Sequence, residues 1–304
     1  MTYQNFLATI LANTKEHFNT DTDISIHSIL KNNNVRLDGL TIMTDGFNIS
    51  PTIYLNEYYE EYKHGKAIHQ IMDDILHIYR QNQPNESVDA SFYTEFSNIS
   101  DKILYKLVNY KENEALLHEI PHFRFLDLAI VFYCMISTTP RGSATILIYN
   151  DHLSYWNITR DILHQHAITN TPSRLPCVFR SITDILSELM AERAISNPFA
   201  NTSKEDFTSL DKSMYVLTNK QKLYGASCLI YPSVLSDIAK KLQCDYYILP
   251  SSIHEVLLIP ARKEFTEEEL NDMVLEVNET QVATEELLSD HVYFYSCAKG
   301  TLCL

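Results

Sequence analysis

The chain has 304 residues, of which 45% are hydrophobic and 21% are charged, and this is the composition of a globular protein long enough to bury a core. Its net charge of -15 opposes nucleic-acid phosphates, so no direct nucleic acid binding is expected. Only 6 glycines occur, and neither G-x-G-x-x-G nor G-x-x-x-x-G-K-[ST] is present, which argues against phosphate-loop chemistry.

The N-terminal segment lacks the basic start and the continuous apolar stretch of a signal peptide. It predicts instead an amphipathic helix, whose apolar positions are Phe6, Ile10, Leu11 and Phe18. The longest apolar run, 128–136, is too short for a bilayer span of roughly 20 residues. No membrane partner is therefore expected.

The 6 cysteines form no C-x-x-C pair, which argues against a zinc ribbon and a thioredoxin-like motif. Cys134 and Cys228 stand inside apolar runs, where a free cysteine behaves as a small hydrophobe. We infer reduced thiols and a cytoplasmic protein, and we expect no cofactor.

Three stretches of the chain follow one plan, in which strands are followed by an amphipathic helix. In the first, the strand 24–30 and the strand after Pro51 precede a helix whose apolar stripe comprises Ile68, Ile71, Met72, Ile75, Leu76 and Tyr79. The second has strands at 124–136 and 144–149, and the third has strands at 214–219 and 226–231 before a helix that Pro232 opens. These strand–strand–helix modules predict an α+β fold with mixed or antiparallel sheets covered by helices.

Two further helices are expected between the modules. The first covers roughly 99–118, where Ile103, Leu104, Leu107 and Val108 are spaced as on one face of a helix. The second covers roughly 178–195, with an apolar stripe of Ile182, Ile185, Leu186 and Leu189.

The polar, turn-rich segment 196–213 is the predicted linker between an N-terminal region, 1–195, and a C-terminal module, 214–304. Within that module the strands DYYILP and EVLLIP, an acidic helix over about 266–278 and a last strand HVYFYSC are expected after the helix.

The segment HEIPH, 118–122, matches the H-E-x-x-H pattern of zinc peptidases literally. That pattern needs one continuous helix, so that both histidines face the metal. Pro121 would break such a helix, at about 3 kcal/mol or more. We therefore expect the chain to pass from helix to strand at Pro121, and we interpret His118, Glu119 and His122 as an accidental match without a metal.

His69, Asp73 and His77 are spaced four apart and would share one helical stripe, as metal ligands do. The stripe is polar and lies opposite the apolar one, so we interpret it as a solvated face.

The segment PSSIHE, 250–255, separates two apolar strands and is a natural turn. On a strand Ser252 and His254 would point to one side, with Glu255 opposite, and either Asp245 or Glu255 is a potential orienting acid. The nucleophile-elbow signature G-x-S-x-G is absent. The sequence leaves open whether this segment is a structural turn or a site.

Seven stretches carry a resemblance that covers nearly the whole chain: 30–42, 48–62, 106–133, 170–176, 214–235, 245–260 and 288–295. In these stretches, for example LKNNNVRLDGLTI and DYYILPSSIHEVLLIP, the chain resembles an uncharacterised family of unknown function that is widespread in gut Firmicutes. The resemblance implies a bacterial, cytoplasmic protein, and it brings no catalytic residues or cofactor to this sequence.

The sequence favours a non-enzymatic cytosolic protein that binds another macromolecule, most simply a protein. Its aromatic residues Tyr58, Tyr59 and Tyr62 are candidate contacts, because tyrosine is enriched at interfaces, although packing beside the helix explains them equally well. An acidic surface is the other candidate, because 264–290 holds ten acidic residues and no Lys or Arg. The alternatives are a hydrolase centred on Ser252 and His254, and an acidic mimic of nucleic acid. The partner and the oligomeric state do not follow from the sequence.

Overall fold

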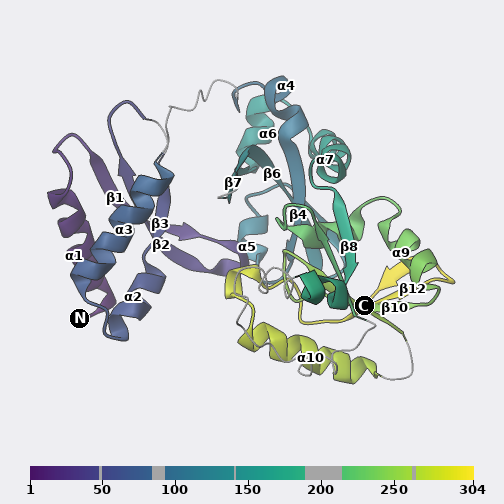
Figure 1. The fold of residues 1–304 in the computed structure, drawn as a ribbon. Coiled ribbons are helices and arrows are strands. Elements are labelled where there is room, and N and C mark those ends of the chain that lie inside the picture. Colours follow the sequence, from purple (N-terminus) through teal and green to yellow (C-terminus); the bar gives the residue numbers. More distant parts are fainter. Residues whose placement is uncertain (48–49, 84–92, 140–141, 189–213, 262–264) are drawn as a thin grey trace. The chain divides into compact units, whose positions relative to one another are not determined.

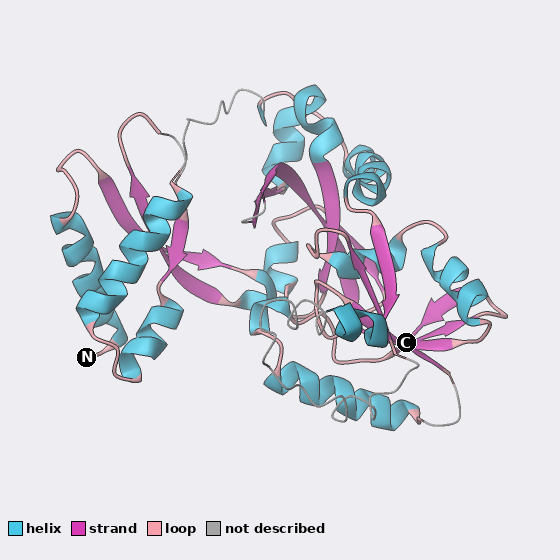
Figure 2. Cartoon of the chain, viewed as in Figure 1, coloured by secondary structure: helices cyan, strands magenta, loops and turns pink. Residues whose placement is uncertain are grey.

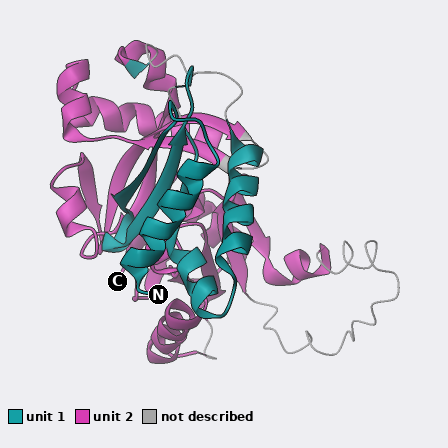
Figure 3. Ribbon diagram, turned by 90° about the vertical axis from the view of Figure 1, so that its left-hand side faces the viewer, with its two compact units in different colours: residues 1–93 teal, residues 94–304 magenta. Residues whose placement is uncertain are grey.

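The computed structural model describes residues 1–47, 50–83, 93–139, 142–188, 214–261 and 265–304 (Figure 1). The chain divides into two compact units, Met1–Tyr93 and Thr94–Leu304 (Figure 3). Helices and antiparallel sheets occur in both units, so the predicted α+β class is confirmed (Figure 2). The described residues form three sheets, with three, four and six strands.

Unit 1 is a three-stranded antiparallel sheet in the order β1-β2-β3, packed against helices (Figure 1). Its elements are α1 (Tyr3–Glu16), β1 (Asp23–Leu30), η1 (Asn32–Asn34), β2 (Arg36–Met43), β3 (Thr52–Tyr54), α2 (Asn56–Lys63) and α3 (Ile68–Asn82). The predicted stripe of α3 is confirmed, because Ile68 is half-buried against the core and the other members are buried, namely Ile71, Met72, Ile75, Leu76 and Tyr79. The predicted N-terminal helix is also present as α1, and it buries Phe6 and Ile10 against the same core.

The first half of unit 2 contains the four-stranded sheet, in which β6 pairs with β4, β5 and β7. Its elements are α4 (Phe96–Ile99), η3 (Ser100–Lys102), β4 (Ile103–Asn109), α5 (Glu114–Leu117), β5 (His122–Phe125), β6 (Leu128–Thr139), β7 (Gly142–Leu147), α6 (Asn150–Trp156) and α7 (Arg160–Arg174).

The helix predicted over 99–118 is wrong, because its centre is the strand β4. Ile103, Leu104, Leu107 and Val108 do stand at helical spacing, but Tyr105 between them is 1% exposed as well. A strand buried on both faces gives such a continuous apolar run, which periodicity alone does not distinguish from a helix. The helix α7 holds the strand from one side, where the Thr171 hydroxyl accepts a hydrogen bond from the Tyr105 main-chain N–H at 3.1 Å.

The second half of unit 2 contains the six-stranded antiparallel sheet, in the order β13-β12-β10-β11-β9-β8. Its elements are β8 (Cys177–Ser181), β9 (Tyr215–Asn219), η5 (Gly225–Ile230), α9 (Val234–Leu242), β10 (Tyr246–Leu249), β11 (Val256–Pro260), α10 (Glu267–Thr280), η6 (Thr284–Glu286), β12 (Tyr293–Ser296) and β13 (Thr301–Cys303). The expected strands at 214–219, 245–250 and 255–260, the acidic helix and the last strand are therefore present.

The strand predicted at 226–231 is wrong, because this segment is the 3-10 helix η5. Tyr224 before it adopts a left-handed conformation with φ of 51°, which turns the chain away from β9 and over the sheet. A short 3-10 helix buries the same apolar residues as a strand, but without a partner strand beside it. The helix predicted over 178–195 is also wrong at its start, where β8 stands, although 182–188 is helical.

The predicted linker 196–213 lies outside the described residues, so the predicted division into 1–195 and 214–304 stays a prediction. The described strands on the two sides of that segment belong to one sheet, because β8 pairs with β9 from Cys177↔Asn219 to Ser181↔Tyr215.

Candidate functional site

The segment HEIPH does not form a continuous helix. The helix α5 ends at Leu117, His118 follows it as the cap, and β5 begins at His122, so the transition predicted at Pro121 is confirmed. The main-chain carbonyl of Glu119 accepts a hydrogen bond from the main-chain N–H of Asn150 at 3.0 Å, which anchors the turn. The two histidines consequently belong to different elements and do not share a helical face.

The stripe of His69, Asp73 and His77 lies on the exposed side of α3, as predicted. Among the described residues no cluster of three or more His, Cys, Asp or Glu side chains is arranged to hold a metal ion.

The candidate tyrosines of α2 are half-buried in the core of unit 1. The Tyr59 ring lies 4.9 Å from that of Tyr3 and 5.3 Å from that of Phe6, and the Tyr59 hydroxyl donates to the Met1 carbonyl at 3.1 Å. Packing against this core therefore accounts for the positions of Tyr58, Tyr59 and Tyr62, and a role in binding stays a prediction.

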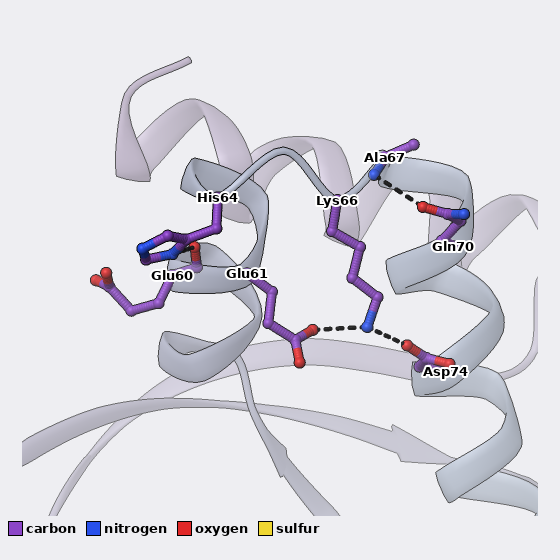
Figure 4. A network of polar contacts seen from close by, with 7 residues as sticks. All are labelled: Glu60, Glu61, His64, Lys66, Ala67, Gln70 and Asp74. Carbon is purple, nitrogen blue, oxygen red and sulfur yellow. Dashed lines mark hydrogen bonds and ion pairs between the residues drawn. The ribbon is translucent and has the colours of Figure 1, made fainter.

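The turn that follows α2 is fixed by an ion-pair network. Lys66 bridges Glu61 of α2 and Asp74 of α3, at 2.8 Å and 2.5 Å respectively (Figure 4). The network ties the two helices together at the surface of unit 1, so it serves the packing of this unit.

The segment PSSIHE forms the connection between β10 and β11, which pair as neighbours from Tyr246↔Pro260 to Leu249↔Leu257. Ser252 is 5% exposed, and its hydroxyl accepts a hydrogen bond from the main-chain N–H of His254 at 3.0 Å. This bond is typical of a serine that stabilises a turn. Its donor is the main chain of His254 and not the imidazole.

The imidazole of His254 is held by other groups. Its Nδ1 lies 3.2 Å from the main-chain N–H of Tyr224 and 3.1 Å from the carbonyl of Lys222, while its Nε2 lies 3.5 Å from a Glu286 carboxylate oxygen. A neutral imidazole carries one proton. With that proton on Nε2, the imidazole faces the Glu286 carboxylate with an N–H group, and Nδ1 accepts a hydrogen bond from the main-chain N–H of Tyr224. The Tyr224 ring also stacks on the imidazole at 5.6 Å.

The loop after β9 is closely fitted to this histidine. The buried Asn219 side chain organises the loop by accepting from the main-chain N–H groups of Gln221 and Leu223. At Gly225, which follows Tyr224, there is no room for a side chain, because an added Cβ would lie 2.3 Å from the His254 carbonyl. Segments far apart in the sequence are thus joined here by main-chain contacts.

A third segment completes this junction. The main-chain N–H of Leu288 donates to Ser251, and that of Ser289 donates to Pro250. Asp127, from the turn before β6 of the four-stranded sheet, accepts hydrogen bonds from the Ser289 and Tyr293 hydroxyls. Four of the stretches that carry the family resemblance therefore meet at one place: 106–133, 214–235, 245–260 and 288–295.

A cleft of about 650 Å³ opens beside the junction, over the outer face of β8, β9 and β11. Its floor is apolar and consists of Val178, Val216 and Leu257. These side chains lie on one face of the sheet, because Arg180 pairs with Val216, and Val216 pairs with Leu257. Glu255 lines the cleft, whereas its neighbour His254 points into the junction.

The rim of this cleft carries three cations, Arg180, Lys220 and Lys222, in a chain whose net charge is -15. Arg180 is paired with Glu188 at 2.6 Å, and this pairing raises the pKa of the guanidinium and lowers that of the Glu188 carboxyl. Neither exposed lysine belongs to an ion pair within the described ranges. Sequence reasoning missed this group, because its members come from separate strands, and the close spacing of Lys220 and Lys222 was its one local signal.

The acidic segment contributes the helix α10, which buries Leu270, Val274 and Asn278 and exposes its acidic residues. The exposed acids are Glu267, Glu268, Glu269, Asp272, Glu276 and Glu279. Glu269 caps the helix, because its carboxylate accepts from the main-chain N–H and the hydroxyl of Thr266, and these bonds lower its pKa. The others form a charged face over one helix.

The described residues thus define an α+β chain that combines a loop junction with an adjacent cleft. The chain belongs to DUF5688, a family of unknown function, whose model matches residues 3–297. No curated protein matches the chain, and no solved structure matches it either. Across the part of the chain that the structure describes, no helix is both long and apolar enough to cross a membrane.

Proposed function

We propose that the protein acts by binding a protein partner rather than by catalysis, and that an extended acidic segment of the partner adds to β8 beside the cleft. The observation that carries this proposal is the edge of β8 that no described strand covers, next to Lys220, Lys222 and an apolar floor.

The main chain of β8 supplies the first part of the recognition. In an antiparallel pair, every second residue of a strand forms main-chain hydrogen bonds to its neighbour. The main-chain N–H of Lys220 donates to Pro176, and that of Ile182 donates to Met214, so the even-numbered residues of β8 are the ones bonded to β9. Cys177, Phe179 and Ser181 therefore direct their main-chain groups away from β9. No described strand pairs with that edge. An added strand would satisfy these groups, as in peptide recognition by strand addition.

The side chains supply the selectivity. A strand beside β8 would place alternate side chains over the sheet face that carries Val178 and Arg180. Apolar side chains would meet the floor of the cleft, and carboxylates would meet Lys220 and Lys222 at its rim. Because both lysines are exposed, their positive charge speeds the association of a carboxylate-bearing segment and thereby lowers the Kd.

The two alternatives have less support. A hydrolase would need the Ser252 hydroxyl on the imidazole of His254, whereas that hydroxyl accepts from a main-chain N–H. A mimic of nucleic acid would need two rows of carboxylates, whereas α10 offers a single helix. Both remain hypotheses.

Binding of a labelled peptide of alternating valine and aspartate, followed by fluorescence anisotropy, tests the proposal. The variant K220E/K222E should weaken binding about tenfold, which corresponds to about 1.4 kcal/mol. The matched control K111E/K299E reverses two exposed lysines elsewhere in unit 2 and should bind as the wild type does. Equal binding by the two variants, or equal binding of a valine–lysine peptide, would contradict the proposal. A long-chain fatty acid that competes fully with the peptide would indicate a small-molecule site instead.

A further inference from the structure

Two cysteines lie beyond the same end of a strand pair in the six-stranded sheet. The strands β10 and β12 are antiparallel, with Tyr247↔Phe294 and Tyr246↔Tyr295 in register. Cys244 stands two residues before Tyr246, and Cys297 stands two residues after Tyr295. Both cysteines line one cleft together with Tyr295, whose ring stacks on that of Tyr246 at 5.0 Å.

A side chain links the two segments beyond the ends of the strands. The Asp245 carboxylate accepts a hydrogen bond from the main-chain N–H of Cys297 at 2.7 Å. Neighbouring strands lie about 4.8 Å apart, and a disulfide joins residues whose Cα atoms are about 4.4–6.8 Å apart, so segments that continue two such strands come within its reach.

Both thiols are open to reagents. Cys297 is exposed, Cys244 is half-buried, and both line a cleft of about 650 Å³ that Asp245 also lines. By contrast, Cys134 and Cys228 are buried, and burial raises the pKa of the Cys134 thiol to about 11. The thiols of Cys177 and Cys228 lie within hydrogen-bonding distance of each other, but Cys228 is buried, whereas Cys244 and Cys297 share an accessible cleft.

We propose that Cys244 and Cys297 are a redox-modification site, at which hydrogen peroxide converts the two thiols into an intramolecular disulfide. Cys244 attacks the peroxide, becomes a sulfenic acid and releases one water molecule. Cys297 then attacks the Cys244 sulfur, and a second water leaves as the S–S bond forms. The two electrons lost by the sulfurs reduce the peroxide, and thiol–disulfide exchange with a small thiol reverses the step.

The order of the two thiols follows from their surroundings. The Asp245 carboxylate lies beside Cys297, since it accepts a hydrogen bond from the main-chain N–H of Cys297 at 2.7 Å, and its negative charge opposes a thiolate on the Cys297 sulfur. A thiol that keeps its proton reacts slowly with peroxide, because the thiolate is the nucleophile. Cys244 is therefore the attacking residue and Cys297 the resolving one.

Oxidation of the full chain with hydrogen peroxide tests this site, with free thiols counted after denaturation and cross-linked peptides identified by mass spectrometry. Two of the 6 thiols should disappear in the wild type, linked as Cys244–Cys297, and dithiothreitol should restore them. C297S should instead accumulate a sulfenic acid at Cys244, detectable with dimedone, whereas C244S should react far more slowly.

The matched control is C303S, which removes an exposed cysteine of β13 and should still form the Cys244–Cys297 bond. Melting curves of the reduced variants show whether each one folds. If C244S is folded, its failure to form the disulfide can be attributed to the missing thiol. An unchanged thiol count in folded wild-type protein would overturn the proposal, as would a bond that joins other cysteines or two chains.

Discussion

The two faces of the six-stranded sheet are covered to different extents. On one face, Tyr246, Ile248, Leu258 and Tyr293 are 0% exposed, and η5 and α9 lie on this side. On the other face, α10 packs on Leu249, Ile259 and Val292, and Val178, Val216 and Leu257 form the floor of the cleft beside β8. The closed face stabilises the sheet, whereas the partly open face leaves apolar side chains accessible at the cleft.

The largest effect is expected on the closed face, for the change Ile238→Asp. Ile238 is 4% exposed on α9, so the variant buries a carboxylate without a partner. We expect a loss of about 3–5 kcal/mol in the free energy of unfolding. Urea unfolding measures it directly.

The matched control is Lys241→Asp on the exposed side of the same helix. Its ammonium lies 5.1 Å from the ring of Phe179, a contact of small energy at an exposed position. A change of about 0.5 kcal/mol or less is expected. Equal destabilisation by the two variants would mean that α9 faces the other way.

A smaller effect is expected on the partly open face, for the change Leu270→Ala. Leu270 is 0% exposed between α10 and the sheet, so its truncation leaves a cavity and should cost about 2–4 kcal/mol. Leu275 on the same helix is 44% exposed, and Leu275→Ala should change stability by about 0.5 kcal/mol or less. If Leu275→Ala lowered the free energy of unfolding as much as Leu270→Ala, then Leu275 would have to pack against another part of the protein.

The smallest effect concerns pH and the cap of α10. The pKa of Glu269 is lowered in the folded protein by the hydrogen bonds from Thr266, so its contribution is present above the pKa of the unfolded chain. That contribution is lost as pH falls through the lower pKa of the folded protein. The melting temperature of E269A should therefore lie below that of the wild type at pH 7, and the difference should narrow below about pH 4. A difference that stays constant down to about pH 2, below both pKa values, would show that the carboxylate does not cap the helix.

Much of the fold was predictable where local and tertiary preferences agree. The helix α3 has an apolar stripe on one side and a solvated side opposite, so periodicity alone located it. The strand β4 and the 3-10 helix η5 lack such a contrast, because nearly all of their residues are buried. Their conformation depends on neighbours distant in sequence, such as Thr171 for β4.

The candidate site was predictable only in part. Pro121 could be interpreted correctly because the effect of proline on a helix is local. The segment PSSIHE was correctly located between two strands, but the partners of His254 come from 222–224 and from Glu286, which no spacing in the sequence connects. The cleft likewise depends on strand order, which brings Arg180 of β8 alongside β9.

The hydrogen bonds of Asp127 have a consequence for the order of folding. Asp127 reaches Ser289 and Tyr293, which are 162 and 166 positions away along the chain. Contacts with such large sequence separation form late, because the loop that they close is long. Asp127→Asn should therefore accelerate unfolding and leave the refolding rate nearly unchanged, as for a residue whose contacts are absent from the transition state. Asp127 would then slow the separation of the two sheets of unit 2 without speeding their association. Stopped-flow refolding and unfolding would measure both rates.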